Sequence, residues 1–325
     1  MAGAGYYKVD DHSRIIQSVD ASDGSSSTTD LLTNQHQNTD SGNLYAYSYT
    51  HWPDRVIWTL GMGVEQTDVP GRRETEPTPK LGVEYRPTDS LTLRGAAFRT
   101  VKSNVVAQQT IQPTLVAGFN QIYDDFNGTK ANQAAVGADL KLRSDLTVGV
   151  EAIYRDISAP QIDNDVGDSD VLVQDASEGL AQAYVYWTPT DRIAVSFALR
   201  GGRYRAHDDD AVSVPQDIDS VLAPLSVRYF DPSGFFALAG VQYVGQSVTL
   251  DDGPGRESTQ WGDSWLVDAA IGYRLPNRRG IVSLDLNNIL DQSIHWQDDS
   301  FRSSEQQNRR FIPERSAMIR LNLNF

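Results

Sequence analysis

The sequence lacks cysteine entirely across its 325 residues, so disulfides play no part in its stability. It also lacks any run of about 18 consecutive apolar residues, which excludes a membrane-spanning helix. Its mean hydropathy is only −0.43. A membrane β-barrel is still allowed, because barrel strands need an apolar residue only at every second position.

Positive charge is scarce: 28 Lys and Arg stand against 43 Asp and Glu, which gives a formal net charge of −15. We expect no nucleic-acid partner, because phosphate neutralisation needs a basic face. The chain shows no signal peptide, and Met1 leads directly into a segment of Gly and Tyr. We expect a mature chain or the C-terminal part of a longer protein, with residues 1–325 forming a single barrel domain.

Motifs for catalysis and for cofactors are missing as well. The sequence contains no Gly-rich phosphate loop and no Cys/His metal spacing. His207 beside Asp208–Asp210 alone resembles an activated pair, but a lone histidine in an acidic loop is more often simply solvated. We therefore expect neither an enzyme nor a bound cofactor or metal.

Six short segments rich in Pro, Asp, Asn, Ser and Gly are typical of tight turns. They are residues 52–55, 87–90, 143–145, 189–192, 231–234 and 276–280. Long polar stretches separate them, at 20–42, 102–132, 157–178, 206–218, 248–262 and 291–314. This alternation is typical of an outer-membrane barrel, with short periplasmic turns and long extracellular loops.

The segments between the turns alternate apolar and polar residues with period two, which predicts strands. Six turns join twelve strands, and one strand at each end (about 3–18 and 316–325) raises the predicted number to about fourteen. A further hairpin in the first 40 residues would raise it to sixteen. The fold class is thus all-β: an antiparallel up-and-down transmembrane β-barrel.

A soluble barrel with an apolar interior would show the same alternation. Two observations favour the membrane. Aromatic residues lie beside the predicted turns, as an interfacial girdle requires; these are Trp52, Tyr85, Trp187, Tyr229 and Tyr273. A soluble barrel of fourteen strands would also enclose a core too wide for side chains to fill. We expect a bacterial outer-membrane location, with outer-membrane lipid and lipopolysaccharide as surroundings.

The C-terminal region resembles a known family. Residues 286–292, followed by 311–316 and the strand to Phe325, are similar to the closing hairpin of TonB-dependent receptors, although Glu314 stands where a Gly is usual. Leu321, Leu323 and Phe325 resemble the signal read by the outer-membrane barrel assembly machinery. A TonB-dependent receptor would also need a plug domain and 22 strands, more than this length holds.

Residues 91–99 and 109–121 resemble a second group, outer-membrane proteins that carry a tetratricopeptide-repeat region before a C-terminal barrel. This resemblance covers roughly residues 40–325. It implies a periplasmic tetratricopeptide-repeat region or a secretion complex as a partner. The sequence itself contains no such 34-residue helical repeat.

The polar side of the predicted strands carries mixed charge. One interpretation is a hydrated lumen whose charges set solute selectivity; the other is cross-strand pairing that holds the wall. The predicted lumen-lining residues are Glu84, Arg86, Arg94, Asp139, Lys141, Glu151, Arg155, Arg200, Arg228, Asp268, Arg274, Asp285 and Arg320.

Two loop features have open interpretations. The acid-rich loops, such as 163–178, either bind divalent cations or a cationic substrate, or form a solvated rim. The long loop 102–132 either folds inward and narrows the pore or packs outside as a flap. Its candidate constriction residues are Phe119, Tyr123, Asp124, Asp125 and Phe126.

These features lead to three hypotheses for function. The first is an outer-membrane pore, a channel or export conduit, with exopolysaccharide as the solute by analogy with repeat-plus-barrel proteins. The second is a non-transporting barrel that anchors a periplasmic or surface assembly. The third is the barrel of a TonB-type receptor for a small ligand.

Overall fold

The computed structural model of the chain describes residues 1–20, 28–69, 72–103, 112–123, 125, 127–162, 171–207, 215–251, 257–293 and 314–323. The chain is almost entirely β. Among these residues, no helix is long and apolar enough to cross a membrane. The helical part described is a single 3-10 turn, η1 (Pro276–Arg278).

Fourteen strands form one antiparallel sheet in which neighbours along the chain are neighbours in space. Their bounds are β1 Ala2–Asp20, β2 Thr28–His51, β3 Val56–Val69, β4 Arg72–Tyr85, β5 Leu91–Val101, β8 Lys130–Arg143, β9 Leu146–Ile162, β10 Val171–Thr190, β11 Ile193–Ala206, β12 Pro215–Phe230, β13 Phe235–Asp251, β14 Glu257–Arg274, β15 Gly280–Asn287 and β16 Ser316–Leu323. The predicted up-and-down fold and its strand number are confirmed.

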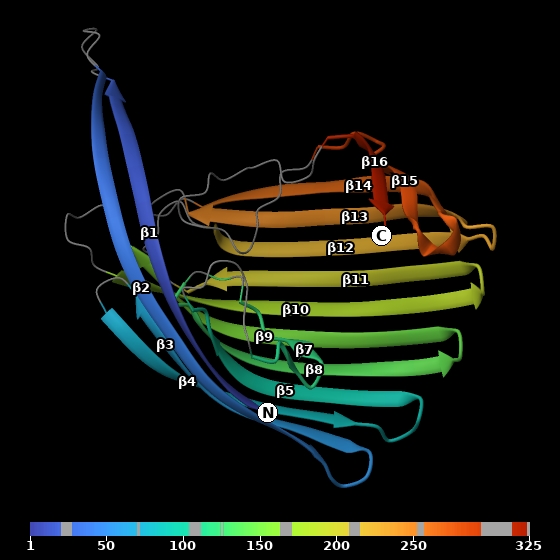
Figure 1. The fold of residues 1–325 in the computed structure, drawn as a ribbon, viewed down its shortest axis with the longest axis horizontal. Coiled ribbons are helices and arrows are strands. Elements are labelled where there is room, and N and C mark those ends of the chain that lie inside the picture. The colour runs from blue at the N-terminus through green and yellow to red at the C-terminus, as the bar shows by residue number, and fades with distance from the viewer. Residues whose placement is uncertain are drawn as a thin grey trace.

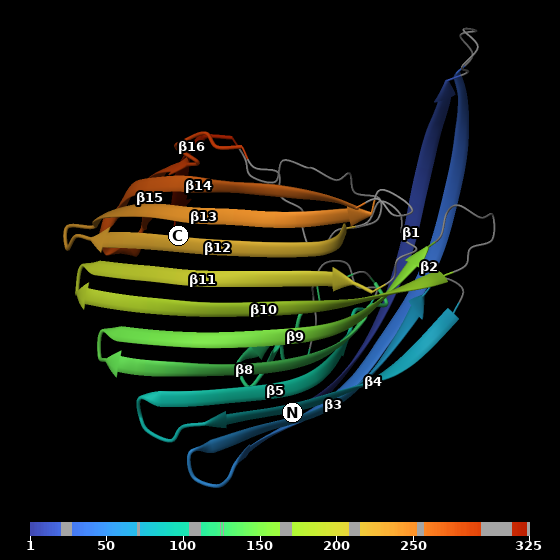
Figure 2. The same cartoon turned by 180° about the vertical axis from the view of Figure 1, so that it is seen from behind.

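The sheet is curved and open (Figures 1 and 2). In the part of the chain that the structure describes, β1 pairs only with β2, and β16 pairs only with β15. The closure that we expected from the last strand is therefore not seen between these two edges. The two edge strands also differ in length, because β16 ends after eight residues whereas β1 has 19.

The predicted turns all join consecutive strands, but several predicted loops are wrong. The strands extend well into the polar stretches at 20–42, 157–178, 206–218 and 248–262. Polar residues sustain a ladder there because strand pairing uses backbone groups, whereas an apolar face is needed only where lipid touches the wall. The strict alternation of short and long connections also fails at β3–β4, where Val69 pairs with Arg72, and at β13–β14, where Asp251 pairs with Glu257.

The first two strands project beyond the rest of the sheet (Figures 1 and 2). β2 pairs with β1 from Thr28 to Ala46, but with β3 only from Ser41 onward. The part of β2 before Ser41 is therefore held by β1 alone, as a two-stranded ribbon.

The strands of the sheet have two ends. We call the end at which the six short turns lie the short-turn end, and the opposite end the loop end.

A small second sheet lies against the large one. β6 (Leu115–Val116) and β7 (Phe119–Asn120) form a hairpin within the segment that joins β5 to β8. Its side chains pack against Phe98 and Ala135 of the large sheet. We call the sheet face that carries this hairpin the inner face, and the segment 102–129 the inner loop.

The two faces of the sheet differ in chemistry. The outer face exposes large apolar side chains, among them Leu60, Leu81, Val136, Val150, Phe197, Leu225, Ile271 and Ile319. The inner face carries the charged residues of the alternating pattern. An apolar face turned away from the enclosed side is what a lipid-surrounded barrel requires, and it is the reverse of a soluble barrel.

Candidate functional site

The hairpin in the inner loop is tightly seated on the wall. Val116 and Phe119 are 0% and 1% exposed. The wall makes room for them with glycine: a Cβ added at Gly82 would lie 2.8 Å from the Cβ of Ala117, and one at Gly137 would lie 3.3 Å from the Phe119 ring. The hairpin thus descends from the loop end to Gly82, which lies close to the short-turn end of β4.

Arg94 on β5 is the centre of a charged network beneath the hairpin. Its Nε donates to Asp139 Oδ2 at 3.0 Å, and its Nη2 donates to Glu151 Oε2 at 3.3 Å. Its guanidinium carbon lies 4.7 Å from the centre of the Phe119 ring, a cation–π contact. Arg94 therefore links its own strand, β5, to β8, to β9 and to the hairpin.

The same network continues onto β10 through two polar side chains. Gln182 Nε2 donates to Glu151 Oε1 at 2.5 Å, and the Tyr184 hydroxyl donates to Asp139. Each carboxylate thus accepts bonds from more than one donor. These contacts compensate charge that would otherwise be costly in a partly buried position.

A second cation ties the inner loop to the wall nearer the loop end. Arg155 on β9 is 3% exposed. It donates through Nη1 to Glu178 Oε2 at 2.5 Å and through Nη2 to Asp125 of the inner loop. The loop is therefore anchored by ion pairs at one point and by apolar packing at another.

Amide and phenol groups fasten the other side of the inner loop to β2 and β3. Gln112 Nε2 donates to Glu65, and the Tyr47 hydroxyl donates to Gln112 Oε1 at 3.4 Å. Gln121 Nε2 donates to the Tyr47 hydroxyl at 3.4 Å, and within the loop the Tyr123 hydroxyl donates to Gln121 Oε1 at 3.0 Å. Burial raises the pKa of Tyr123 further above its ordinary range, and a phenol is a hydrogen-bond donor throughout the physiological pH range.

Strand register places the predicted lumen-lining residues on the inner face. One rung runs through Glu84, Arg94, Gly137, Glu151, Gln182 and Arg200. The other predicted positions follow at even spacing along their strands, and Arg86 follows β4 with its Nη2 3.8 Å from Glu84 Oε2. Whether these side chains line a solute path remains a prediction.

The remaining predicted site residues have mixed outcomes. Phe119, Tyr123 and Asp125 are held on the inner face, whereas Asp124 and Phe126 lie outside the described residues. Leu321 and Leu323 lie on the outer face of β16, and Phe325 also lies outside the described residues. Of the predicted acidic loop residues, Asp175 and Glu178 belong to β10 instead, whereas positions 163–170 and 208–214 fall outside the described part.

Sequence reasoning missed Tyr47, Gln112 and Gln121, which hold the inner loop, and Tyr184, which donates to Asp139 within the wall. The sequence did carry a signal for Tyr184, because it lies two residues from Gln182, on the same polar side of β10. The small residues Gly82 and Gly137 on the polar side were a further signal, since they leave space for another segment. Gln112 and Gln121 carried no local signal because their partners are distant in sequence.

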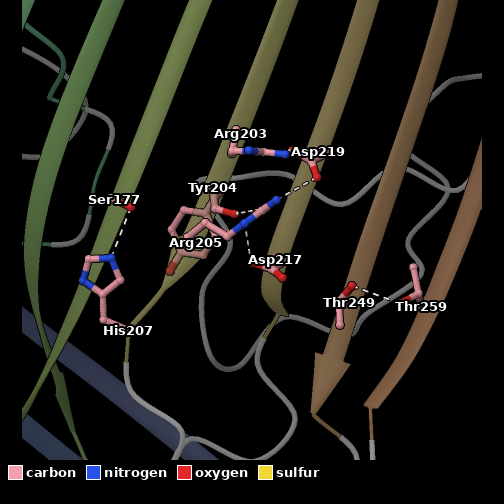
Figure 3. Close-up of polar contacts among 9 residues, drawn as sticks. All are labelled: Ser177, Arg203, Tyr204, Arg205, His207, Asp217, Asp219, Thr249 and Thr259. Carbon is pink, nitrogen blue, oxygen red and sulfur yellow. Dashed lines mark hydrogen bonds and ion pairs between the residues drawn. The ribbon is translucent and has the colours of Figure 1, made fainter.

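The outer face carries a polar ladder at the loop end of β10–β14 (Figure 3). Arg203 and Arg205 both donate to Asp219 at 2.8 Å, and Arg205 Nε lies 2.7 Å from Asp217 Oδ1. His207 Nε2 lies 3.2 Å from Ser177 Oγ. His207 thus contacts a hydroxyl, while its acidic sequence neighbours 208–210 fall outside the described residues.

Within the described ranges, no group of three or more His, Cys, Asp or Glu side chains could hold a metal ion. The inner-face carboxylates instead accept hydrogen bonds from Arg and amide donors. The arrangement braces the wall and fastens the inner loop to it.

Comparison with known proteins gives the family. Residues 1–289 match the family model described as "TonB dependent receptor-like, beta-barrel". No curated protein matches the chain. The family match supports the first resemblance seen in the sequence, whereas the tetratricopeptide-repeat resemblance gains no support.

Solved structures share the fold at low identity. The ferric-catecholate import receptor Fiu from Escherichia coli K12 has a TM-score of 0.65 and 15% identity, over 100% of this chain and 51% of that one. FpvA of Pseudomonas aeruginosa, bound to pyoverdine, gives 0.60 and 14%, over 91% and 40%. The FrpB iron transporter of Neisseria meningitidis gives 0.63 and 13%, over 90% and 46%.

This chain therefore spans about half the length of the solved structures that it matches. The sequence predicted about fourteen strands, fewer than the 22 of a receptor barrel, and this difference argued against the family. The partial coverage accounts for the difference. The polar inner face, the apolar outer face and the family match agree with one another. The chain belongs to the TonB-dependent receptor-like β-barrel family and is a bacterial outer-membrane protein.

Proposed function

We propose that the chain forms the wall of a receptor-type barrel that imports a small ligand across the outer membrane. The family match over residues 1–289 carries this proposal. It favours the receptor hypothesis over the export conduit that the sequence first suggested. In this assignment the short-turn end faces the periplasm and the loop end faces outside.

The inner loop supports import of a compact solute over export of a polymer. Its hairpin covers the inner face beside Arg94 and reaches towards the short-turn end. A conduit for a long polysaccharide needs a clear path along its whole height. A wall that carries a seated hairpin instead leaves room for a solute of limited size.

The fold relatives supply the ligand classes to test first. Fiu is named as a ferric-catecholate import receptor, and FrpB as an iron transporter. The experiment deletes the gene and measures uptake of 55Fe-labelled catecholate and pyoverdine chelates, the ligands named for Fiu and FpvA. We expect the loss of uptake of one of these, restored by a plasmid copy.

The opposite outcome is equally specific. If uptake of every tested chelate is unchanged while secretion of an exopolysaccharide falls, the export hypothesis replaces the receptor. If neither changes and a surface assembly is lost, the anchor hypothesis replaces it.

The outer surface leads to a proposal for partners. The apolar band of the outer face suits outer-membrane lipid, and the polar ladder of Figure 3 lies beyond it, at the level expected for lipopolysaccharide headgroups. Leu321 and Leu323, on the lipid side of the last described strand, are suitably placed to contact the barrel assembly machinery. Copurification of assembly factors with the wild-type chain, and its loss on removal of 316–325, tests the last point.

A further inference from the structure

The charges of the inner face are not balanced one for one. From β3 to β15, each carboxylate that the structure describes on this face has a partner. Asp139 and Glu151 pair with Arg94, and Glu178 pairs with Arg155. Glu65 accepts from Gln112, and Glu84 pairs with Arg86. The remaining pairs are Glu74 and Glu76 with Lys130, Asp285 with Arg320 at 3.6 Å, and Asp268 with the backbone N–H of Asn288 at 2.8 Å.

Four basic residues of the same face have no such partner. Lys141, Arg200, Arg228 and Arg274 form no ion pair or side-chain hydrogen bond within the described part of the chain. All four side chains are exposed. In a chain of net charge −15, the charge left over on the inner wall is positive.

Register places these four cations at two heights. Lys141 follows Asp139 on the same side of β8, and its backbone N–H donates to Ser90 at the short-turn end. Arg228 and Arg274 also lie beside short turns. Arg200 lies higher, because Arg228 pairs with Ala194, which is about 20 Å below Arg200 at the usual rise per residue.

This distribution suits a negatively charged solute. Guanidinium groups match carboxylate and phosphate oxygens with two parallel hydrogen bonds. Rows of Arg and Lys also favour anions in membrane pores. A solute descending the inner wall would meet Arg200 first and the three lower cations last.

We propose that the inner wall binds small anionic solutes through Lys141, Arg200, Arg228 and Arg274, which deepens and rests on the proposed import function. The solute class is a compact anion bearing carboxylate, phosphate or similar oxygens. Cationic solutes would be repelled, because the carboxylates that would attract them already have partners.

The test measures binding of 32P-labelled pyrophosphate, a compact polyanion, by the purified full-length protein in detergent without divalent cations. One variant replaces all four cations with Gln. The matched control is Arg203→Gln, three positions from Arg200 on β11 but on the outer face. Heat-modifiable mobility in SDS gels verifies that each variant folds.

We expect saturable binding that weakens with added salt. The four-site variant should bind at least about tenfold more weakly, since charge-assisted hydrogen bonds are lost, and Arg203→Gln should match the wild type. Absence of saturable wild-type binding, equal loss in both variants, or stronger binding of spermidine than of pyrophosphate would overturn the proposal.

The uptake experiment keeps the two proposals separable. If gene deletion abolishes uptake of a chelate but the four-site variant binds pyrophosphate and transports normally, only the anion proposal fails. If gene deletion affects no uptake, the import proposal fails, and the pyrophosphate measurement still decides whether the wall binds anions.

Discussion

At the scale of single residues, Arg94 links two carboxylates and an aromatic ring on the inner face. Its side chain is 12% exposed and neutralises both Asp139 and Glu151. Removing a cation from such a site leaves two carboxylates without their counter-charge. The loss of stability then comes mainly from the two carboxylates left unpaired, more than from the lost hydrogen bonds themselves.

We therefore expect Arg94→Met to lower the free energy of unfolding by on the order of 2 kcal/mol or more. Arg86→Met should cost less than about 0.5 kcal/mol, because its ion pair with Glu84 is long and exposed. Urea unfolding in lipid vesicles measures both. Adding Asp139→Asn and Glu151→Gln to Arg94→Met should recover most of the loss, and equal effects of the two single variants would contradict this account.

Asp231, in the turn between β12 and β13, gives a pH-dependent prediction outside the membrane-spanning strands. Hydrogen bonds from the Ser233 hydroxyl and backbone N–H, and then from Tyr229, lower the pKa of this carboxyl. Its stabilising effect is therefore present above the unfolded-state pKa and lost as pH falls through the lower folded-state pKa.

Ser233→Ala removes one donor, so we expect the pKa of Asp231 to rise towards its ordinary value of 3.8. Selective 13C labelling of the carboxyl and an NMR pH titration in micelles measure it. Thr88→Ala, in a different turn, is the control and should leave Asp231 unchanged. An unshifted Asp231 in Ser233→Ala would show that the hydroxyl does not hold the carboxylate.

At the scale of elements, the β6–β7 hairpin depends on space left by glycine. We expect Gly82→Val to displace the hairpin, because its Cβ would lie 2.8 Å from that of Ala117. Hydrogen exchange at residues 115–120 should become faster. Gly179→Val is the matched control, since nothing lies within 4 Å of the Cβ position there. Equal exchange in the two variants would mean that the hairpin is not seated at Gly82.

At the scale of the whole molecule, the polarity of the two faces decides the surroundings. The hairpin and the buried ion pairs lie on the charged side, so the exposed apolar side faces outward. A soluble barrel would have the opposite sidedness. The position of the inner loop therefore identifies the apolar band as the side suited to lipid.

An outward charge in this band should be costly in a bilayer. Val150 on β9 is 54% exposed on the outer face, and Val173 on β10 is 58% exposed near the loop end. We expect Val150→Arg to destabilise the folded barrel by about 2–4 kcal/mol and Val173→Arg by about 0–1 kcal/mol. Unfolding titrations in vesicles measure both costs, and a cost below about 1 kcal/mol for Val150→Arg would place Val150 outside the hydrocarbon region.

Much of the fold followed from local patterns. Period-two alternation identified which residues share a face, and turn chemistry located the six turns of the short-turn end but missed the short β3–β4 connection. Strand ends were predicted poorly at the loop end, where Asp156 and Ser177 continue the ladder with polar groups on the outer face while Ile157 and Ala176 belong to a small apolar cluster on the inner face. Polarity signals the end of the lipid-facing segment, but backbone pairing continues beyond it.

The sequence by itself determined the strand number and the chemistry of each face, because both depend on neighbours two residues apart. Only the tertiary structure decided which face is enclosed, which cations are paired and where the inner loop rests. Arg94 and Glu151 are 57 positions apart, and Gly82 meets Ala117 only after β4, β5 and the hairpin are assembled. Such contacts depend on strand register and chain reversal, which no local pattern encodes.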